Sequence, residues 1–321
     1  MHYDIFNGDA DGICALHQLR LAEPKKLSTL VTGVKRDVKL LSHISESVTA
    51  ADSLTVLDVS MDSNKDAIAQ ILNKGVAVFY ADHHFAGEIP KSGLLEAHID
   101  PSADTCTSLI IDSLLGGRYK PWAVVGAFGD NLHDAALEAA GSIKLKDTDI
   151  KALRELGELL NYNGYGAQVS DLHCAPQSLY EAIRPFESPI DFIGSSSVME
   201  KLRLGFKSDM HNARAQKTYL ANASGRVFMF PPEPWSRRVA GVFSNEKARE
   251  RPELAHALLV DNDDGTYLVS VRAPLERKAG ADRLCRAFPT GGGRAAAAGV
   301  NFLSAARLAE FVEKFTETFS P

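Results

Sequence analysis

Residues 76–84 of this chain read VAVFYADHH, and the fold class follows most directly from this stretch. Its first five residues are rich in β-branched and aromatic side chains, as expected of a buried strand. A helical pattern over residues 64–73 precedes it, and another short apolar run, residues 54–57, precedes that helix. Strands that alternate with helices predict an α/β protein with a parallel, doubly wound sheet.

Acidic and imidazole side chains follow three of the predicted strands. The strand at residues 76–80 leads into Asp-His-His at residues 82–84, and Asp58 ends the strand before it. Residues 7–12, NGDADG, follow the first strand-like run of the chain. Ligands of doubly wound sheets bind beyond the carboxyl ends of the strands. We therefore expect these side chains to meet in one site.

Each of these features also has an ordinary structural explanation. An Asp-x-Asp loop is often a solvated turn, and a single acid at a strand end is often a helix N-cap. A ligand site is favoured because three strand ends deliver the same kinds of side chain. Asp130 is a fourth candidate, since it follows the apolar run at residues 122–128, which we assign to a further segment of the same sheet.

This combination of residue types points to divalent metal ions. Carboxylates a few ångströms apart repel one another unless a cation lies between them. Carboxylates combined with imidazoles suit manganese better than magnesium, which prefers oxygen ligands and water. The motifs supply about five carboxylate or imidazole ligands, which is more than one open catalytic ion needs. This number suits two metal ions about 4 Å apart, the arrangement that hydrolyses phosphate esters. The predicted cofactor is thus two Mn²⁺, with Mg²⁺ as the alternative.

In their order and spacing, these motifs resemble those of a known family. Asp-x-Asp, the strand-end Asp58, Asp-His-His and Gly129-Asp130 are similar to the four motifs of the DHH phosphoesterase superfamily. Residues 291–299, GGGRAAAAG, are similar to the GGGHxxAAG motif of the associated DHHA1 domain. Together the motifs cover nearly the whole chain.

The resemblance implies a role for each matching residue. Asp58 bridges the metal ions, His84 contacts the phosphate or the nucleophile, and Asp82 orients the imidazoles. The implied metal ligands are Asp9, Asp11, Asp58, His83 and Asp130, and the implied substrate-binding residues are Arg272, Gly291, Gly292, Gly293 and Arg294.

The chain departs from the family pattern at several positions. Ile5 stands where many members that act on short substrates carry His, and Asn7 stands where RecJ-type exonucleases commonly carry Asp. Either one metal has fewer protein ligands, or Asn7 takes part. Arg294 replaces the usual His, which implies retained phosphate or base recognition with altered preference. His133 is a further weak candidate, and Lys35 a minor candidate for a phosphate contact.

Length and composition fit a two-domain protein. At roughly 150 residues per domain, 321 residues suffice for about two. We expect a catalytic metal-binding domain at residues 1–185, a helical linker at 186–225 and a smaller α/β substrate-binding domain at 226–321. The four scattered cysteines and the lack of a signal-like or membrane-spanning run predict a cytoplasmic protein. The net charge of −6 argues against duplex DNA as a partner.

The predicted function is hydrolysis of short linear oligonucleotides to mononucleotides by a manganese-dependent, nanoRNase-like phosphodiesterase. Dinucleotides such as pGpG or pApA are the expected substrates, because a two-domain acidic chain suits a small enclosed ligand. The enzymatic alternatives are a 3′-phosphoadenosine 5′-phosphate phosphatase and a RecJ-like single-strand exonuclease. A nucleotide sensor without catalysis is the non-enzymatic alternative, and a homodimer is a plausible assembly for this family.

Overall fold

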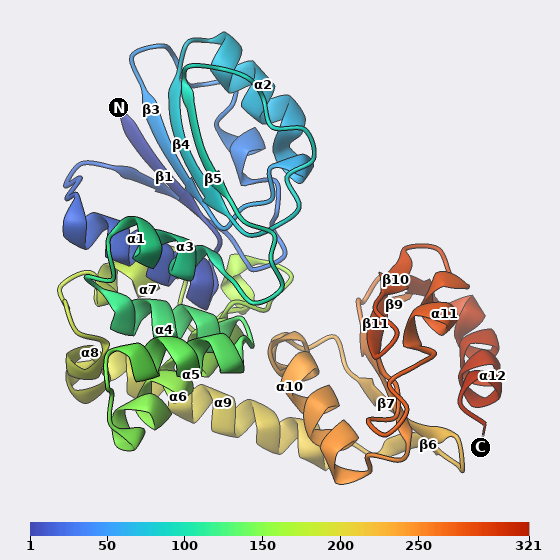
Figure 1. Cartoon of the computed structure of the whole chain (residues 1–321). Helices are drawn as coiled ribbons and strands as arrows, with labels where there is room; N and C mark the ends of the chain where they lie inside the picture. Colours follow the sequence, from blue (N-terminus) through green and yellow to red (C-terminus); the bar gives the residue numbers. More distant parts are fainter. Residues whose placement is uncertain (321) are drawn as a thin grey trace. The chain divides into compact units, whose positions relative to one another are not determined.

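The computed structural model describes residues 1–320 and divides the chain into two compact units (Figure 1). The first unit is Met1–Leu204 and the second is Gly205–Pro321. The division falls within helix α9, Ser197–Ala215, and so inside the segment that the sequence predicts to be a linker. Each unit has its own sheet.

The first unit is built on a five-stranded parallel sheet in the order β2-β1-β3-β4-β5. The α/β fold class and the strands expected at residues 3–6, 54–57 and 76–80 are thereby confirmed. The chain leaves β1 for β2 on one side and later returns to β3 on the other side of β1, so the order reverses between β1 and β3. The strands are β1 His2–Phe6, β2 Thr29–Val31, β3 Ser53–Leu57, β4 Ala77–Asp82 and β5 Leu95–Ile99.

Helices cover both faces of this sheet (Figure 1). On one face, apolar residues of the strands such as Ile5, Val56 and Tyr80 pack with Ile68 and Ile71 of α2. On the other face lies α1, which contacts α3 and α4. The helices of the unit are α1 Ala10–Ala22, η1 Leu40–His43, η2 Asp62–Asn64, α2 Lys65–Asn73, α3 Thr107–Leu114, α4 Lys120–Gly129, α5 His133–Ser142, α6 Asp147–Asn163, η3 Val169–Asp171, α7 Pro176–Ile183 and α8 Pro189–Ser195.

A buried ion pair fastens α1 to β1 near the amino ends of the strands. Asp4 is fully buried, and Arg20 of α1 donates to it from both Nε and Nη2, the latter at 2.5 Å. Arg20 also donates to Thr55 Oγ1 of β3 at 2.8 Å. Burial acts to raise the pKa of Asp4, but hydrogen bonds from His2 and Arg20 and the charge of Arg20 lower it to about 2. The carboxylate therefore contributes to stability in its ionised form.

The second unit holds a six-stranded mixed sheet in the order β10-β11-β9-β8-β7-β6. Among its neighbouring strands, β7 and β8 run parallel and all other pairs run antiparallel. Its core includes Leu259, Val269 and Val271 from the strands, with Phe311 and Phe315 from α12. The elements are β6 Thr218–Ala221, β7 Gly225–Phe230, α10 Pro234–Glu250, β8 Ala255–Asp261, β9 Thr266–Arg272, α11 Ala281–Arg286, β10 Gly291–Gly293, β11 Ala297–Ser304, η4 Ala305–Arg307 and α12 Leu308–Thr318.

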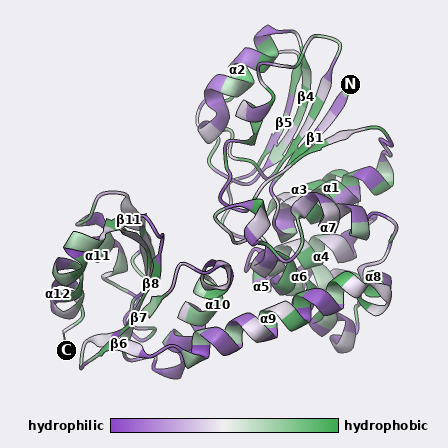
Figure 2. Cartoon of the chain, turned by 180° about the vertical axis from the view of Figure 1, so that it is seen from behind, coloured by the Kyte–Doolittle hydropathy of each residue, from purple (hydrophilic) through white to green (hydrophobic). Residues whose placement is uncertain are grey.

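Hydropathy separates the buried elements from the exposed ones. In Figure 2 the hydrophobic colour gathers in the strands and in the helices that cover them, whereas α9 is mixed along its length. Among the described residues, no helix is both long and apolar enough to span a membrane.

Candidate metal centre of the first unit

Three neighbouring strands place their carboxyl ends at one point of the sheet. Asn7 follows β1, Asp58 follows β3, and Asp82 is the last residue of β4. The register pairs Phe6 of β1 with Leu57 of β3, so Asn7 and Asp58 leave the sheet at the same level. Doubly wound folds bind ligands at this place, beyond the carboxyl ends of the strands where the strand order reverses between β1 and β3.

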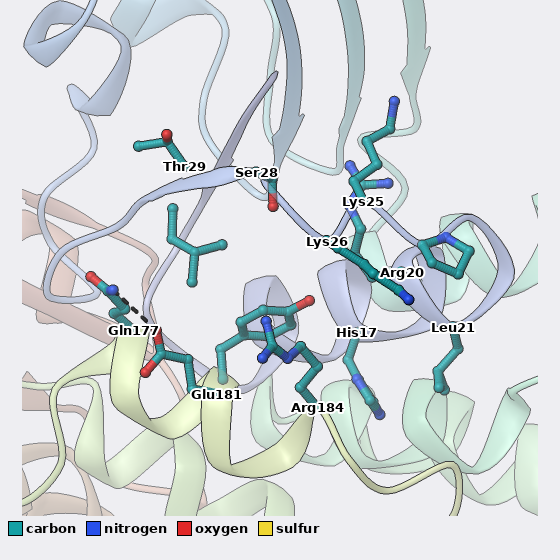
Figure 3. Close-up of a pocket in the computed structure, with 13 residues that line it drawn as sticks. His17, Arg20, Leu21, Lys25, Lys26, Ser28, Thr29, Gln177, Glu181 and Arg184 are labelled. Atoms are coloured by element: carbon teal, nitrogen blue, oxygen red, sulfur yellow. Dashed lines mark hydrogen bonds between the residues drawn. The ribbon is translucent and has the colours of Figure 1, made fainter. Parts of the chain in front are cut away.

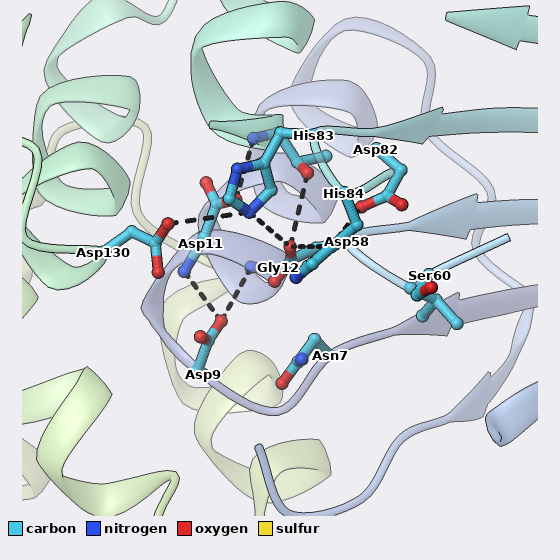
Figure 4. A network of polar contacts seen from close by, with 12 residues as sticks. Asn7, Asp9, Asp11, Gly12, Asp58, Ser60, Asp82, His83, His84 and Asp130 are labelled. Atoms are coloured by element: carbon cyan, nitrogen blue, oxygen red, sulfur yellow. Dashed lines mark hydrogen bonds and ion pairs between the residues drawn. The ribbon is translucent and has the colours of Figure 1, made fainter. Parts of the chain in front are cut away.

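Asp58, His83 and His84 form the centre of the cluster (Figure 4). One potential ligand atom from each of the three lies within 4.8 Å of the others. His83 Nε2 is 3.4 Å from Asp58 Oδ1, and His84 Nδ1 is 3.9 Å from the same oxygen. These separations exceed a close charge-assisted hydrogen bond of about 2.8 Å and leave room for an ion at bond lengths of about 2.1 Å. Asp58 Oδ1 and His83 Nε2 are therefore spaced so that one divalent cation can bind both.

The backbone at Asp58 is held in an unusual conformation. Its φ is 57°, in the left-handed region that non-glycine residues seldom adopt. Its amide donates to the Ala81 carbonyl at 3.1 Å, which ties the strand end to β4. Backbone strain of this kind persists where the surrounding structure fixes it, and it clusters at functional sites.

Asp82 and His84 form a short pair beside this centre. The His84 Nδ1–H donates to Asp82 Oδ1 at 2.7 Å. This hydrogen bond raises the pKa of His84, although burial acts to lower it. Asp82 is fully buried, whereas the side chain of His84 is 44% exposed. The pair thus fixes an imidazole whose Nε2 is left for another partner.

The Asp-x-Asp loop supplies two carboxylates that also organise helix ends. Asp9 is the N-cap of α1, and its Oδ1 accepts from the amides of Asp11 and Gly12 at 3.0 and 3.1 Å. Asp11 accepts from the amides of Thr107 and Ser108, both at 2.8 Å, and so caps α3. Gly12 is required because a Cβ there would lie 2.3 Å from the Asn7 carbonyl oxygen.

Asp130 joins the cluster from a helix, and its assignment to a further segment of the sheet is wrong. Residues 122–128 lie in α4, and Asp130 is the C-cap of that helix. The helix is buried on all sides, so its sequence shows no helical period and resembles a buried strand. Asp130 Oδ2 nevertheless lies 3.6 Å from His83 Nε2, which brings it beside the centre.

The negative charges of the clustered carboxylates favour the binding of a cation. Burial raises the pKa of Asp58 well above its usual value, and the neighbouring carboxylates of Asp9, Asp11, Asp130 and Asp82 raise it further. Asn7 Oδ1 is a buried acceptor with no hydrogen-bond partner, as is Asp82 Oδ2. An ion held by the groups around Asp58 would relieve the repulsion among these carboxylates.

Lys35 and Asn161 belong to the site in a way the sequence did not predict. Lys35 Nζ donates to Asp9 Oδ2, to Asn161 Oδ1 at 2.9 Å and to Asp130 Oδ1 at 3.3 Å. Burial acts to lower the pKa of Lys35, but nearby charges, Asp9 foremost, hold it well above its usual value. Burial acts to raise the pKa of Asp9, yet the charge of Lys35 lowers it. Both groups are therefore ionised at neutral pH.

The remaining predicted residues lie at the start of α5 and in the second unit. His133 begins α5 and its ring lies 5.9 Å from that of Phe128. In the second unit, Arg272 ends β9 and donates to Asn245 Oδ1 at 2.8 Å. The three glycines form β10, which pairs antiparallel with β11, and Arg294 is exposed in the turn between them.

A separate hollow lies at the other end of α1 (Figure 3). Its volume is about 630 Å³, and Arg20, Lys25, Lys26 and Arg184 are among its lining residues. None of the carboxylates Asp9, Asp11, Asp58, Asp82 and Asp130, called the carboxylate cluster below, is among its lining residues. The hollow therefore has no part in the chemistry proposed for that cluster.

Comparisons with solved structures show which proteins share this fold. Across 98% of the chain it matches a manganese-bound RecJ exonuclease, with a TM-score of 0.62, 14% identity and 88% of that chain covered. Thermus thermophilus RecJ with Mn²⁺ gives a TM-score of 0.65 at 15% identity, and this chain spans 51% of its length. PggH, a pGpG-specific phosphodiesterase from Vibrio, gives 0.52 at 15% identity, with 99% of both chains covered.

Sequence comparison alone adds less. No family model matches the chain. A UDP-N-acetylmuramate–L-alanine ligase of Chlorobium phaeobacteroides is 25% identical over an alignment of 172 residues that covers 51% of this chain. The chain spans only 37% of that ligase. The structural matches thus establish the fold, and the motifs identify the family it resembles. The chain shares its fold with RecJ and PggH, and its Asp-x-Asp, Asp-His-His and Gly-Asp motifs resemble those of the DHH phosphoesterases.

Proposed function

We propose that this chain is a divalent-metal-dependent phosphodiesterase that hydrolyses short linear oligonucleotides, chiefly dinucleotides such as pGpG or pApA. The observation that carries the proposal is the cluster of Asp58, His83 and His84 at the point where the strand order reverses. Further carboxylates surround it, and its fold is shared with enzymes that cleave phosphodiesters.

Different residues of the centre have different roles in the proposed reaction. Asp58, His83 and Asp130 are placed to hold a divalent ion, which supplies charge neutralisation and a nucleophilic hydroxide when bound. Manganese suits this mixture of oxygen and nitrogen ligands. His84 is positioned by Asp82 with its Nε2 free, so it can donate a hydrogen bond to a phosphate oxygen or a proton to the leaving oxygen.

The match to PggH supports a short substrate. PggH corresponds to this chain from end to end, whereas Thermus RecJ is about twice as long. The net charge of −6 also favours a small ligand over a long polyanion. Arg272 and Arg294 remain the proposed phosphate or base contacts of the second unit.

A RecJ-like exonuclease is the second candidate, because the higher TM-score belongs to RecJ. The two candidates differ in how rate depends on substrate length. We expect the manganese-supplemented protein to release mononucleotides from pGpG or pApA much faster than from single strands of five or more nucleotides. Excess EDTA should stop both reactions, which is the control for metal dependence. Equal or faster digestion of the longer strands would reject the dinucleotide preference in favour of the exonuclease.

A further inference from the structure

Lys35 already places a fixed cation inside the carboxylate cluster. An ammonium group has three donors, and Lys35 Nζ has three oxygen acceptors, on Asp9, Asn161 and Asp130. These come from three segments of the first unit: the loop after β1, helix α6 and the end of α4. The ammonium group is thus fully coordinated by protein oxygens.

Hydrogen bonds of the Lys35 backbone hold this ammonium group in position. The Lys35 amide donates to the Gly164 carbonyl at 2.8 Å, and its own carbonyl accepts from Asn7 Nδ2 at 3.3 Å. The Nζ atom also lies 5.7 Å from the centre of the Tyr165 ring. With 20% of its side chain exposed, Lys35 is held from several sides.

Asp130 shows how the ammonium relates to the metal centre. One of its oxygens faces Lys35 Nζ at 3.3 Å, and the other faces His83 Nε2 at 3.6 Å. The carboxylate therefore spans the space between a fixed positive charge and the imidazole beside Asp58.

Asp9, which also accepts from Lys35, has both carboxylate oxygens engaged in hydrogen bonds and so few lone pairs for a second ion. Its Oδ1 accepts two amides of α1, and its Oδ2 accepts from Lys35. Asn7, the other oxygen ligand available there, carries no charge. A second divalent ion next to Asp9 would also meet the ammonium at close range, where the two charges repel strongly.

We propose that Lys35 takes the place of the second metal ion, so that the centre binds one divalent ion per chain. This inference rests on the metal dependence proposed above and replaces the pair of ions expected from the sequence. The single ion is held on the side of Asp58, His83 and Asp130. Lys35 acts as a positioning residue that keeps Asp9 and Asp130 neutralised and in place.

Metal stoichiometry tests this directly and needs no turnover. Metal-free protein is saturated with Mn²⁺ and desalted, manganese per chain is measured by mass spectrometry, and the Mn²⁺ spectrum is recorded by electron paramagnetic resonance. We expect one ion per wild-type chain with the six-line signal of an isolated Mn²⁺. Lys35→Met, which removes the charge and keeps the length, should bind a second ion and show an exchange-coupled pair.

Lys120→Met is the matched control. Lys120 also pairs with a buried carboxylate, Asp112, at 2.5 Å and is 22% exposed, but it lies at the opposite end of α4 from Asp130. It should leave one ion bound, as should Lys35→Arg, which keeps the charge.

The possible outcomes separate the two proposals. Two ions in the wild-type chain would overturn the role of Lys35 even if Lys35→Met failed to fold, and would leave the proposed function standing. A single ion in a folded Lys35→Met would also overturn it. No bound ion in the wild type would contradict the metal-dependent function itself.

Discussion

His83 and His84 are adjacent in the chain but have different surroundings. His83 points its Nε2 between Asp58 and Asp130, and only 18% of its side chain is exposed. His84 is held by Asp82 and is 44% exposed. These positions suit His83 as a metal ligand and His84 as a group that meets the substrate.

A substitution at His84 separates these two roles. His84→Gln keeps a polar side chain but loses the proton donor, so we expect kcat to fall by about 10²–10⁴-fold with Mn²⁺ affinity nearly unchanged. Kinetics on a linear dinucleotide and a Mn²⁺ titration provide the two readouts. His98→Gln is the control, because His98 pairs with Glu96 at the same sequence spacing on the same sheet. A large loss of Mn²⁺ affinity in His84→Gln would place His84 among the ligands.

The sequence predicts individual site residues most directly where a strand delivers them. Asp58 and Asp82 could be assigned because apolar runs end at them, and parallel strands bring their carboxyl ends together. The contact between Lys35 and Asn161 joins residues 126 positions apart, and Asn161 resembles any polar residue near a helix end. No local pattern marks such a contact, since it depends on how α6 packs in the folded unit.

At the scale of helices and strands, uniformly apolar segments are hardest to predict. The strands at residues 54–57 and 76–80 were identifiable because they are short and are separated by an amphipathic helix. Helix α4 lacks that signal because it is buried on every side. The glycine run at residues 291–293 has no strand-like pattern, yet β11 pairs with it and makes it an edge strand. In both cases packing against neighbours decides the structure.

The ion pair between α1 and β1 provides a prediction at this scale. Asp4→Asn would leave Arg20 buried beside a neutral partner, and we expect it to lower the free energy of unfolding by about 3 kcal/mol or more. Urea denaturation at neutral pH measures this loss. Asp100→Asn, at an exposed carboxylate that also has a lowered pKa, is the control and should change stability by less than about 0.5 kcal/mol. An effect of similar size in both variants would contradict the role of the pair.

The same pair predicts a dependence of stability on pH. The pKa of Asp4 is about 2 in the folded chain, below its usual 3.8, so the folded state favours the ionised form. Its contribution, about 2 kcal/mol, is complete above about pH 4 and is lost as the pH falls through 2. Wild-type stability should therefore fall more steeply in this range than that of Asp4→Asn. Parallel curves for the two proteins would argue against it.

For the molecule as a whole, the proposed function depends on one centre in the first unit. The parallel sheet brings Asp58 and His83 together, and α4 adds Asp130 from the other side. The second unit has an independent sheet and core, and it contributes the predicted substrate contacts Arg272 and Arg294. This division means that removing a metal ligand should abolish the chemistry without unfolding the second unit.

The most direct test is the hydrolysis of a linear dinucleotide by the wild-type chain and by Asp58→Ala, each with Mn²⁺ and with EDTA. Asp58 contacts both imidazoles of the centre, so its loss should remove the ion and the reaction together. We predict rapid release of mononucleotides by the wild type with Mn²⁺ alone, and background release in the other three samples. Comparable release by Asp58→Ala, or by the wild type in EDTA, would contradict a metal-dependent reaction at this centre.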